Sequence, residues 1–388
     1  METSQRTPLA AVRDLVAVGQ PLPFHVHDPA GRRLLAEGQV IVSDTQLEML
    51  MERGAWAESE QVHTARKQRE AAGGGAGAAL VSTYRRPSLF DRWERLTWDL
   101  DALLRKVLAG MACGPELHEL ADQLIAQVDR DVDVALFMTI RPPDTRFALY
   151  ALTHALHAAT VGVVLARQLG WPADRQHLLV RAALTMNVSI LELQAHMAAE
   201  PDPPNARQRA AIRAHPEASV TLLMGAGVSD VAWLEAVRQH HERTDGQGYP
   251  AGRRDIDEVA RALGVADVFT AKLSPRAFRQ ALPVQSAARQ LFQDERGGPL
   301  AGGLIKALGL YPPGDLVALK NGEVAVVTHR GASATTPRVA SLSNAAGQPV
   351  ASSLMRDTAH ADYAIVGPAS DPRRFARVLP ERVYGLIE

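Results

Sequence analysis

Apolar residues recur at helical spacing from about residue 130 to about residue 310, and this long stretch constrains the fold more than any other feature. A chain of 388 residues, of which 46% are hydrophobic and 22% charged, has room for two or three domains with cores of their own. The sequence therefore predicts a mainly α protein, in which a helical bundle is flanked by smaller modules.

Changes of pattern divide the chain into five segments. A charged stretch without periodicity after residue 60 leads into an alanine and glycine run at 71–77, which cannot hold a packed element. Helical spacing resumes near Leu89, and short β-type runs follow Pro313-Gly314. We expect a small α/β module over 1–60, a flexible linker over 61–88, a helical adaptor or cap over 89–144, the helical bundle over 145–310 and a β-rich module over 311–388.

Turn chemistry predicts the elements of the first module. Strands are expected at Pro21–Asp28 and Arg33–Val42, because alternating apolar residues flank a proline and glycine turn. A helix is expected to begin at Ser43 or Asp44 and to end at Gly54.

The segments around the bundle leave one alternative open. Apolar residues at helical spacing over 89–128 predict either an adaptor or dimerising helix pair, which would make a homodimer, or a helical cap on the bundle. In the last module, Asn321-Gly322 separates two expected strands, Leu316–Leu319 and Glu323–Thr328.

Composition excludes several classes of protein. The net charge of −1 provides no field for non-specific binding of nucleic acid. The single cysteine, Cys113, excludes an internal disulfide and a cysteine-based zinc cluster. The N-terminus has no apolar core of signal-peptide length, and no run approaches the roughly eighteen apolar residues of a membrane span. The sequence predicts a cytoplasmic protein.

The run from His240 to Pro250 has the most specific chemistry in the chain: His-His-Glu-Arg-Thr-Asp-Gly-Gln-Gly-Tyr-Pro. Its two glycines permit positive φ, and Pro250 fixes the exit from the loop. His241 continues the inward row of the preceding helix, whereas His240 flanks it. Because adjacent helical residues point about 100° apart, the two rings are not expected to face one metal ion symmetrically.

This run resembles the signature of the HD-GYP family, bacterial metal-dependent phosphodiesterases that hydrolyse cyclic di-GMP. The resemblance covers about residues 145–300. It implies an HD-domain helical bundle, in which inward histidine and aspartate side chains bind two or three metal ions, usually iron or manganese. It also implies that Gly248, Tyr249 and Pro250 shape the rim of the site and dock a diguanylate cyclase or another signalling protein.

The resemblance implies further site residues in family order. The metal ligands would be His157, His215, His240, His241 and Asp267. Arg276 and Arg279, together with Tyr249, would bind cyclic di-GMP. Taken alone, His157 is also consistent with an ordinary buried residue, and His154 shares its helix face.

The family's second motif, Leu-His-Asp-x-Gly-Lys, is replaced here by Thr-Met-Asn-Val-Ser-Ile at residues 185–190. The Met186 thioether does not bind a hard cation. Asn187 has no charge to hold two cations together, and Ile190 replaces the family lysine. No catalytic residue is therefore assigned, and we expect at most one divalent metal ion (Fe, Mn or Zn) instead of a bridged pair.

Three functions are consistent with this pattern. The first is a pseudo-phosphodiesterase that binds cyclic di-GMP or a protein partner without hydrolysing the nucleotide. The second is a slow phosphodiesterase with a mononuclear centre. The third is a purely structural interaction protein, which is disfavoured because the fold alone would not require five residues of metal-ligand type. The sequence favours the first, a regulatory protein of cyclic di-GMP signalling.

Overall fold

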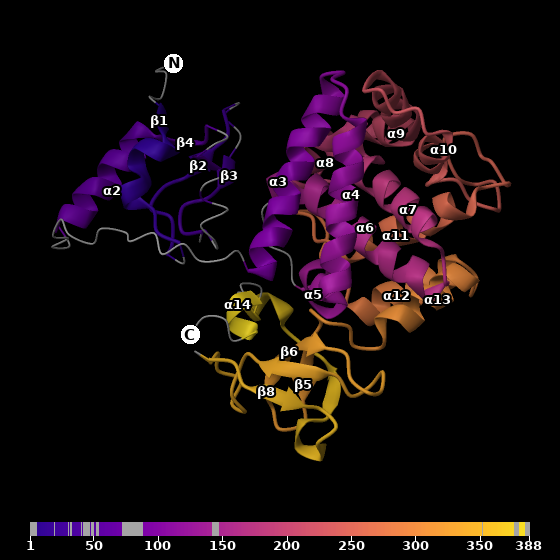
Figure 1. Ribbon diagram of the computed structural model, residues 1–388. Helices are drawn as coiled ribbons and strands as arrows, with labels where there is room; N and C mark the ends of the chain where they lie inside the picture. Colours follow the sequence, from indigo (N-terminus) through magenta and orange to yellow (C-terminus); the bar gives the residue numbers. More distant parts are fainter. Residues whose placement is uncertain are drawn as a thin grey trace. The chain divides into compact units, whose positions relative to one another are not determined.

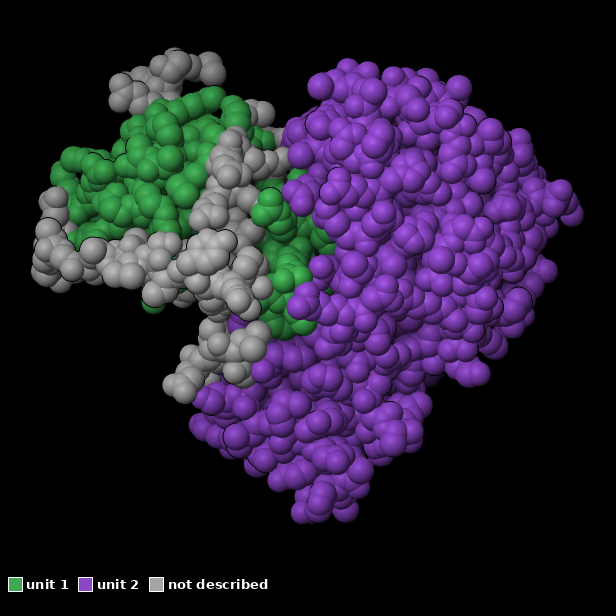
Figure 2. Space-filling model, viewed as in Figure 1, with its two compact units in different colours: residues 1–98 green, residues 99–388 purple. Residues whose placement is uncertain are grey.

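The computed structural model describes residues 6–71, 88–141, 147–375 and 380–384, apart from 19, 30, 32, 40, 42–46, 48–49, 52–53 and 351 (Figure 1). The chain divides into two compact units, residues 1–98 and 99–388 (Figure 2). The predicted fold class is confirmed: a mainly helical chain carries a small antiparallel sheet near each end.

The first unit contains a four-stranded antiparallel sheet with the order β1-β4-β2-β3. Its elements are β1 (Arg6–Pro8), η1 (Leu9–Leu15), β2 (Val26–His27), β3 (Arg33–Leu35), β4 (Trp56–Glu58) and α2 (Ser59–Ala71). The predicted turn joins β2 to β3, where the Gly31 amide donates to the Asp28 carbonyl. The expected helix start at Ser43 or Asp44 lies outside the described residues.

Helix α2 occupies residues where the flexible linker was expected to begin. Of its described side chains, only Val62 and Ala65 are buried, and most of the others are polar or charged. With only two buried apolar residues, the helix lacks the repeated apolar spacing by which a helix is predicted from sequence. The glycine run of the predicted linker lies outside the described residues.

The second unit begins with helices that the sequence predicted as an adaptor or cap; the first of them, α3, starts in the first unit. These are α3 (Leu89–Leu108), α4 (Gly114–Arg130) and α5 (Val132–Ile140). The bundle follows with η2 (Phe147–Leu149), α6 (Tyr150–Gln168), α7 (Ala173–Thr185), η3 (Val188–Ile190), α8 (Leu191–Ala199), α9 (Ala206–Gly225), α10 (Val231–Gln239), α11 (Glu258–Leu273), α12 (Val284–Asp294) and α13 (Pro299–Leu308).

Helix α6 is the centre of the bundle. Most of its residues are buried, and it packs against α7, α11 and α13. Side-chain caps begin the helices that carry the site: Asn205 forms a capping box with Gln208 on α9, and Asp230 accepts the Trp233 amide on α10. These contacts fix the helix positions from which the site residues project.

One described helical stretch, Ala173–Ala199, is apolar and long enough by composition to cross a membrane. However, 61% of its apolar window is buried inside the protein, as expected for a core helix. The described residues therefore contain no clear membrane span.

The C-terminal module is a five-stranded antiparallel sheet with the order β8-β7-β6-β5-β9. Its strands are β5 (Leu316–Leu319), β6 (Val324–His329), β7 (Arg338–Ser341), β8 (Met355–Asp357) and β9 (Ile365–Pro368), and the short helices η4 (Ala361–Tyr363), η5 (Pro372–Phe375) and α14 (Pro380–Val383) accompany them. The first two strands and their Asn321-Gly322 turn match the prediction. Phe137 of α5 packs in the core of this sheet, so bundle and sheet share apolar contacts.

Asp315 is a buried carboxyl group just before β5. Its Oδ2 accepts a 2.6 Å hydrogen bond from Gln285 Nε2, which also donates to the Leu310 carbonyl. Burial raises the pKa of Asp315 to about 7, although hydrogen bonds from Gln285 and from the Leu316 amide oppose the rise. The carboxyl group therefore titrates near neutral pH in the folded protein.

Replacing Asp315 with asparagine is expected to stabilise the protein above neutral pH. Between pH 3.8 and about 7, the folded state binds more protons at this residue than the unfolded state, so wild-type stability falls as the pH rises through this window. The Asp315→Asn variant lacks that loss, and its advantage reaches on the order of 4 kcal/mol above about pH 8. Urea unfolding across this pH range measures the effect. Asp362→Asn, at an exposed position of the same module, is the control, and an unchanged pH dependence in Asp315→Asn contradicts the prediction.

Candidate metal centre

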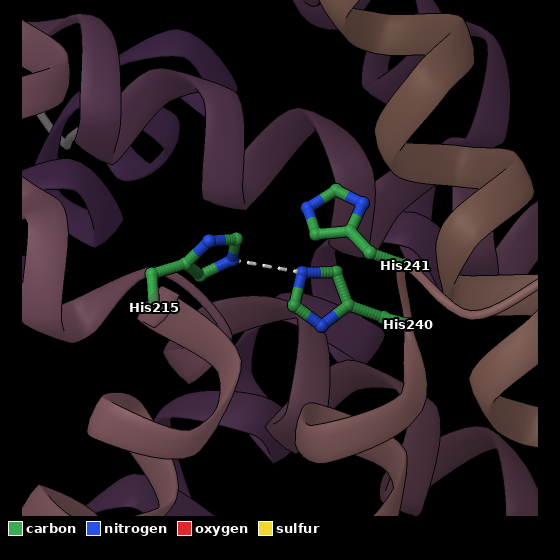
Figure 3. A group of neighbouring side chains, drawn as sticks. All are labelled: His215, His240 and His241. Carbon is green, nitrogen blue, oxygen red and sulfur yellow. Dashed lines mark hydrogen bonds between the residues drawn. The ribbon is translucent and has the colours of Figure 1, made fainter. Parts of the chain in front are cut away.

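Three histidine side chains converge between α9 and the end of α10. His215 lies within α9, and His240 and His241 directly follow the last residue of α10. One ring nitrogen from each lies within 4.8 Å of the other two (Figure 3). Over the described part of the chain, no other three histidine, cysteine or acidic side chains bring their ligand atoms this close together.

Hydrogen bonds to the backbone determine which nitrogen carries the proton in two of these rings. Nδ1 of His215 lies 2.6 Å from the Ile212 carbonyl oxygen, and Nδ1 of His240 lies 2.6 Å from the Val237 carbonyl oxygen. A carbonyl oxygen can only accept, so each Nδ1 carries a proton, and each Nε2 of a neutral ring is a bare lone pair. The two Nε2 atoms face each other at 3.1 Å. Two lone pairs that face each other repel, so a cation or a shared proton between them would stabilise this contact.

Burial disfavours the shared proton. Burial and the neighbouring His240 lower the pKa of His215 to about 3. Burial also lowers the pKa of His240, and burial with the nearby His240 ring takes the pKa of His241 well below its ordinary value. The imidazoles are therefore neutral near pH 7, the form that binds metal. Two nitrogens bound at about 2.0–2.1 Å to a tetrahedral zinc ion lie roughly 3.3 Å apart, so this donor set fits a divalent metal ion.

The end of α10 explains how two adjacent histidines reach one point. The expected angle of about 100° between neighbours applies inside a helix. Here the helix ends at Gln239 and His240 is its C-cap. The ring centroids of His240 and His241 are only 4.1 Å apart, tilted by 40°. His240, expected to flank the site, is also the more buried of the two: it is 3% exposed, whereas the side chain of His241 is 18% exposed.

The loop after α10 contacts the group of three histidines through Tyr249. Tyr249 stacks on His241 with 4.5 Å between ring centroids. The buried Glu242 carboxylate accepts the backbone amides of Ala251 at 2.7 Å and Arg253 at 2.9 Å, which closes the loop on itself. The sequence interpretation gave Glu242 no role, although its place within the motif was an available signal.

The two loop glycines are needed for different reasons. Gly246 has a φ of +78°, as predicted, and Asp245 accepts a backbone amide two residues on at 2.9 Å. Gly248, in contrast, is not among the residues with positive φ. A Cβ there would lie 2.4 Å from the Arg243 amide nitrogen and 2.6 Å from the His241 carbonyl oxygen. Only glycine permits this close approach of the backbone.

Replacing Gly248 with alanine is expected to displace the loop and to destabilise the protein by about 1–3 kcal/mol, because the added methyl group overlaps backbone atoms that cannot move aside. Urea unfolding measures the loss. Gly302→Ala is the matched control, since a Cβ at that helical position meets nothing within 4 Å and is expected to be neutral or slightly stabilising. A Gly248→Ala protein as stable as wild type would contradict the close approach.

Asp267 of α11 is paired with His154 of α6. Its Oδ1 lies 2.7 Å from His154 Nε2, whereas its Oδ2 lies 4.0 Å from His241 Nδ1. Burial alone would raise the pKa of Asp267, but the hydrogen bond from His154 and the nearby histidines hold it well below its usual value. His157 lies three residues beyond His154, outside the group of three, where burial and the neighbouring His154 and Arg141 lower its pKa to about 3.

The positions of the missing second motif lie at the end of α7. Met186 is completely buried as the C-cap of α7, and Asn187 is 6% exposed and precedes η3. Ser189 Oγ donates to the His215 carbonyl at 3.1 Å and lies 2.9 Å from Ser219 Oγ. This turn is therefore attached to α9 by two hydroxyl groups, a contact between distant residues that the sequence interpretation missed.

Arg276 and Arg279 share a tight turn after α11. The backbone amide of each donates to the carbonyl of the other, at 2.8 and 3.0 Å. The Arg276 guanidinium donates to the Tyr150 hydroxyl at 2.9 Å, and that of Arg279 donates to the Ala271 carbonyl. Burial and the charge of Arg276 lower the pKa of Arg279. Among the described residues, neither arginine has an acidic partner.

Comparisons with known proteins agree on the bundle. A family model described as an HD domain matches residues 144–297. Cyclic di-GMP phosphodiesterase PA4108 of Pseudomonas aeruginosa is 27% identical over 227 residues, 57% of this chain and 54% of that protein. Cyclic di-GMP phosphodiesterase response regulator RpfG of Xanthomonas campestris is 31% identical over 136 residues, 34% of this chain and 36% of that protein. The chain thus spans about half the length, or less, of these relatives.

One solved structure also resembles the chain. It is Bd1817, an HD-GYP-type protein from Bdellovibrio bacteriovorus, with a TM-score of 0.49 and 16% sequence identity, over 78% of this chain and 99% of that chain.

The family match and the site coincide. Residues 144–297 contain the three histidines, Asp267, the paired arginines and the complete His240–Pro250 run. The PA4108 relationship covers more than the length of that segment. Residues 144–297 of this chain therefore form an HD domain of the HD-GYP family.

Proposed function

We propose that this chain is a cytoplasmic cyclic di-GMP signalling protein whose HD-GYP domain holds one divalent metal ion and binds the nucleotide, with little or no hydrolysis. The observation that carries this proposal is the group of three neutral histidines beside a second motif that has lost its ligands. His215, His240 and His241 supply three nitrogens, whereas Met186 and Asn187 stand where the family has histidine and aspartate.

The donor set supports one metal ion. Three imidazoles suit zinc or iron and leave a coordination position open. A second ion beside the first would need Asp267 as a protein ligand, but the predicted His157 is not among the histidines that act on this carboxylate. Asp267 is already hydrogen-bonded to His154. Neither the Met186 thioether nor the uncharged Asn187 amide offsets the repulsion between two cations.

The arginine turn supports binding of a phosphodiester. Its two guanidinium groups, which have no acidic partner in the described part of the chain, provide positive charge that a phosphate would compensate, and one of them has a lowered pKa. Arg276 donates to the Tyr150 hydroxyl, and the Tyr150 ring stacks on His154. Arg276 is thus connected through Tyr150 to His154, beside the proposed metal centre.

Hydrolysis is expected to be impaired because the site holds one metal ion instead of two. Hydrolysis of a phosphodiester by this class of site uses paired metal ions, which generate a hydroxide nucleophile and neutralise the phosphate. With one ion, the expected cost is about three decades in rate or more. The open position on a three-histidine centre favours a second candidate, a slow mononuclear phosphodiesterase, because catalytic zinc sites have this arrangement.

The loop above the metal centre is the proposed partner surface. Tyr249 stacks on His241. A diguanylate cyclase or another signalling protein that contacts Gly248, Tyr249 and Pro250 would therefore touch a side chain whose position depends on whether His241 holds a metal ion. The exposed Arg243, Thr244 and Gln247 side chains border this loop.

Metal content and nucleotide chemistry test the proposal together. Purified protein, loaded with iron, manganese or zinc, is expected to retain one ion per chain, to bind cyclic di-GMP in calorimetry and to leave it intact. A variant with Arg276→Gln and Arg279→Gln is expected to bind the nucleotide at least about tenfold more weakly, whereas Arg289→Gln, at an exposed position, is the control. Two ions per chain with rapid conversion to the linear dinucleotide, or no nucleotide binding at all, would overturn the proposal.

A further inference from the structure

The hydrogen bond between His154 and Asp267 joins two residues 113 positions apart in the interior of the bundle. His154 is 3% exposed and Asp267 is 7% exposed. Tyr150 stacks on His154 with only 6° between the ring planes, so the imidazole is held in one orientation. A buried carboxylate is costly without a partner, and His154 Nε2 supplies a donor at 2.7 Å.

The atoms of His154 and Asp267 outside this hydrogen bond show which other side chain the pair acts on. His154 Nδ1 is buried and has no hydrogen-bond partner among the described residues, so Asp267 is the one polar group for which the ring is placed. The free oxygen of Asp267, Oδ2, lies 4.0 Å from His241 Nδ1. The Nδ1 edge of His241 therefore faces a negative charge, which leaves Nε2 as the nitrogen available to the group of three.

We propose that His154 and Asp267 are positioning residues outside the metal shell, which orient His241 as a ligand through its Nε2 nitrogen. This inference rests on the proposed metal site. A carboxylate beside the Nδ1–H of a ligand imidazole stabilises the tautomer with a free Nε2 and makes that nitrogen a better donor. Asp267 would thus support the single ion indirectly, although the sequence interpretation made it a direct ligand.

The loss of the second motif gives His154 this role. With Met186 and Asn187 at the motif positions, no second cation is expected beside Asp267. The N–H group of His154 then takes the place of that cation as the partner of the carboxylate. The pair keeps a negative charge near three neutral histidines, where it balances part of the charge of the bound ion.

Cobalt binding to the full chain tests the inference, because Co²⁺ occupies histidine sites and its visible absorption band reports the ligand set. We expect Asp267→Asn and His154→Ala to bind Co²⁺ about 10–100-fold more weakly, with an absorption spectrum unchanged in position and intensity. His154→Gln is expected to recover part of the affinity, because its amide can still donate to Asp267. Asp255→Asn, at an exposed position, is the control.

The outcomes separate this inference from the proposed function. An altered cobalt spectrum in Asp267→Asn would make Asp267 a direct ligand and overturn the inference, as would an affinity within twofold of wild type. Failure of the wild-type protein to bind Co²⁺, iron or zinc would instead overturn the proposed metal site, and this inference with it. Circular dichroism and urea unfolding of each variant identify a general loss of folding, and a folded His154→Gln that binds no better than His154→Ala also counts against the inference.

Discussion

The His215→Ala variant is expected to lose the metal ion. The substitution removes one of the three nitrogens proposed as ligands, the Nε2 of His215, which faces His240 Nε2 at 3.1 Å. Affinity is expected to fall by more than about a hundredfold, since even hydrogen-bond partners of ligands contribute 10–100-fold. Metal at a hundred times its dissociation constant raises the free energy of unfolding of the wild-type protein by about 2.7 kcal/mol. The same metal concentration is expected to give almost no rise in the variant.

The free energy of unfolding of each protein is compared with and without metal. The loss of stability from removing a buried ring is the same in both measurements and therefore cancels. His196→Ala is the matched control, because it deletes an exposed imidazole from the same bundle. It is expected to keep the full metal-induced stabilisation. If His215→Ala also keeps it, the group of three histidines does not hold the ion.

The candidate metal centre could be predicted from the sequence only where local motifs define it, and its ligands stay a prediction. His215, His240 and His241 were expected as ligands, and the structure brings their nitrogens within 4.8 Å of one another. Their relative orientation could not be predicted, because it depends on where α10 ends. A helix one turn longer would have separated His240 from His241 by about 100°.

Contacts between distant residues were beyond the sequence patterns. His154 was noticed only as a residue on the same helix face as His157, and its bond to Asp267 depends on how α6 packs against α11. The Ser189–Ser219 contact likewise joins η3 to α9. Periodicity shows which face of a helix is apolar, but it does not show which side chain of another helix that face meets.

The same limit applies to the end modules. In the C-terminal sheet, Leu316–Leu319 and its hairpin partner were predicted, because a short Asn-Gly turn connects them. In the N-terminal sheet, β1 and β4 were missed. Each has three residues, too few for alternation to be visible, and they pair across about fifty residues of intervening chain.

Restoring the second motif is expected to have the largest effect on activity. The Met186→His and Asn187→Asp substitutions together supply a nitrogen ligand and a bridging carboxylate at buried positions at the end of α7. The double variant is expected to bind a second ion and to hydrolyse cyclic di-GMP faster than the wild-type protein by about three decades, because a bridged pair generates the nucleophile and neutralises the phosphate.

His154 is expected to limit this gain. The second ion needs Asp267, whose Oδ1 is already hydrogen-bonded to His154 Nε2 at 2.7 Å. Adding His154→Ala to the double variant is therefore expected to raise the affinity for the second ion while it weakens the first, since the same carboxylate cannot serve both arrangements fully. Titration of each variant with Mn²⁺, followed by metal analysis, separates the two affinities.

The single variants are the controls for cooperation between the two restored residues. Asn187→Asp alone adds a buried charge without the adjacent nitrogen ligand, and Met186→His alone adds a ligand without the bridge, so each is expected to recover less than a tenth of the double variant's rate. Metal-free, the double variant is expected to be less stable than the wild-type protein, because a buried aspartate and histidine replace an amide and a thioether. Added metal is expected to reverse that loss. A double variant that holds one ion and turns over no faster than the wild-type protein would contradict the prediction. That result would show that other residues also prevent hydrolysis. Ile190, at the family's lysine position, would then be the next residue to restore.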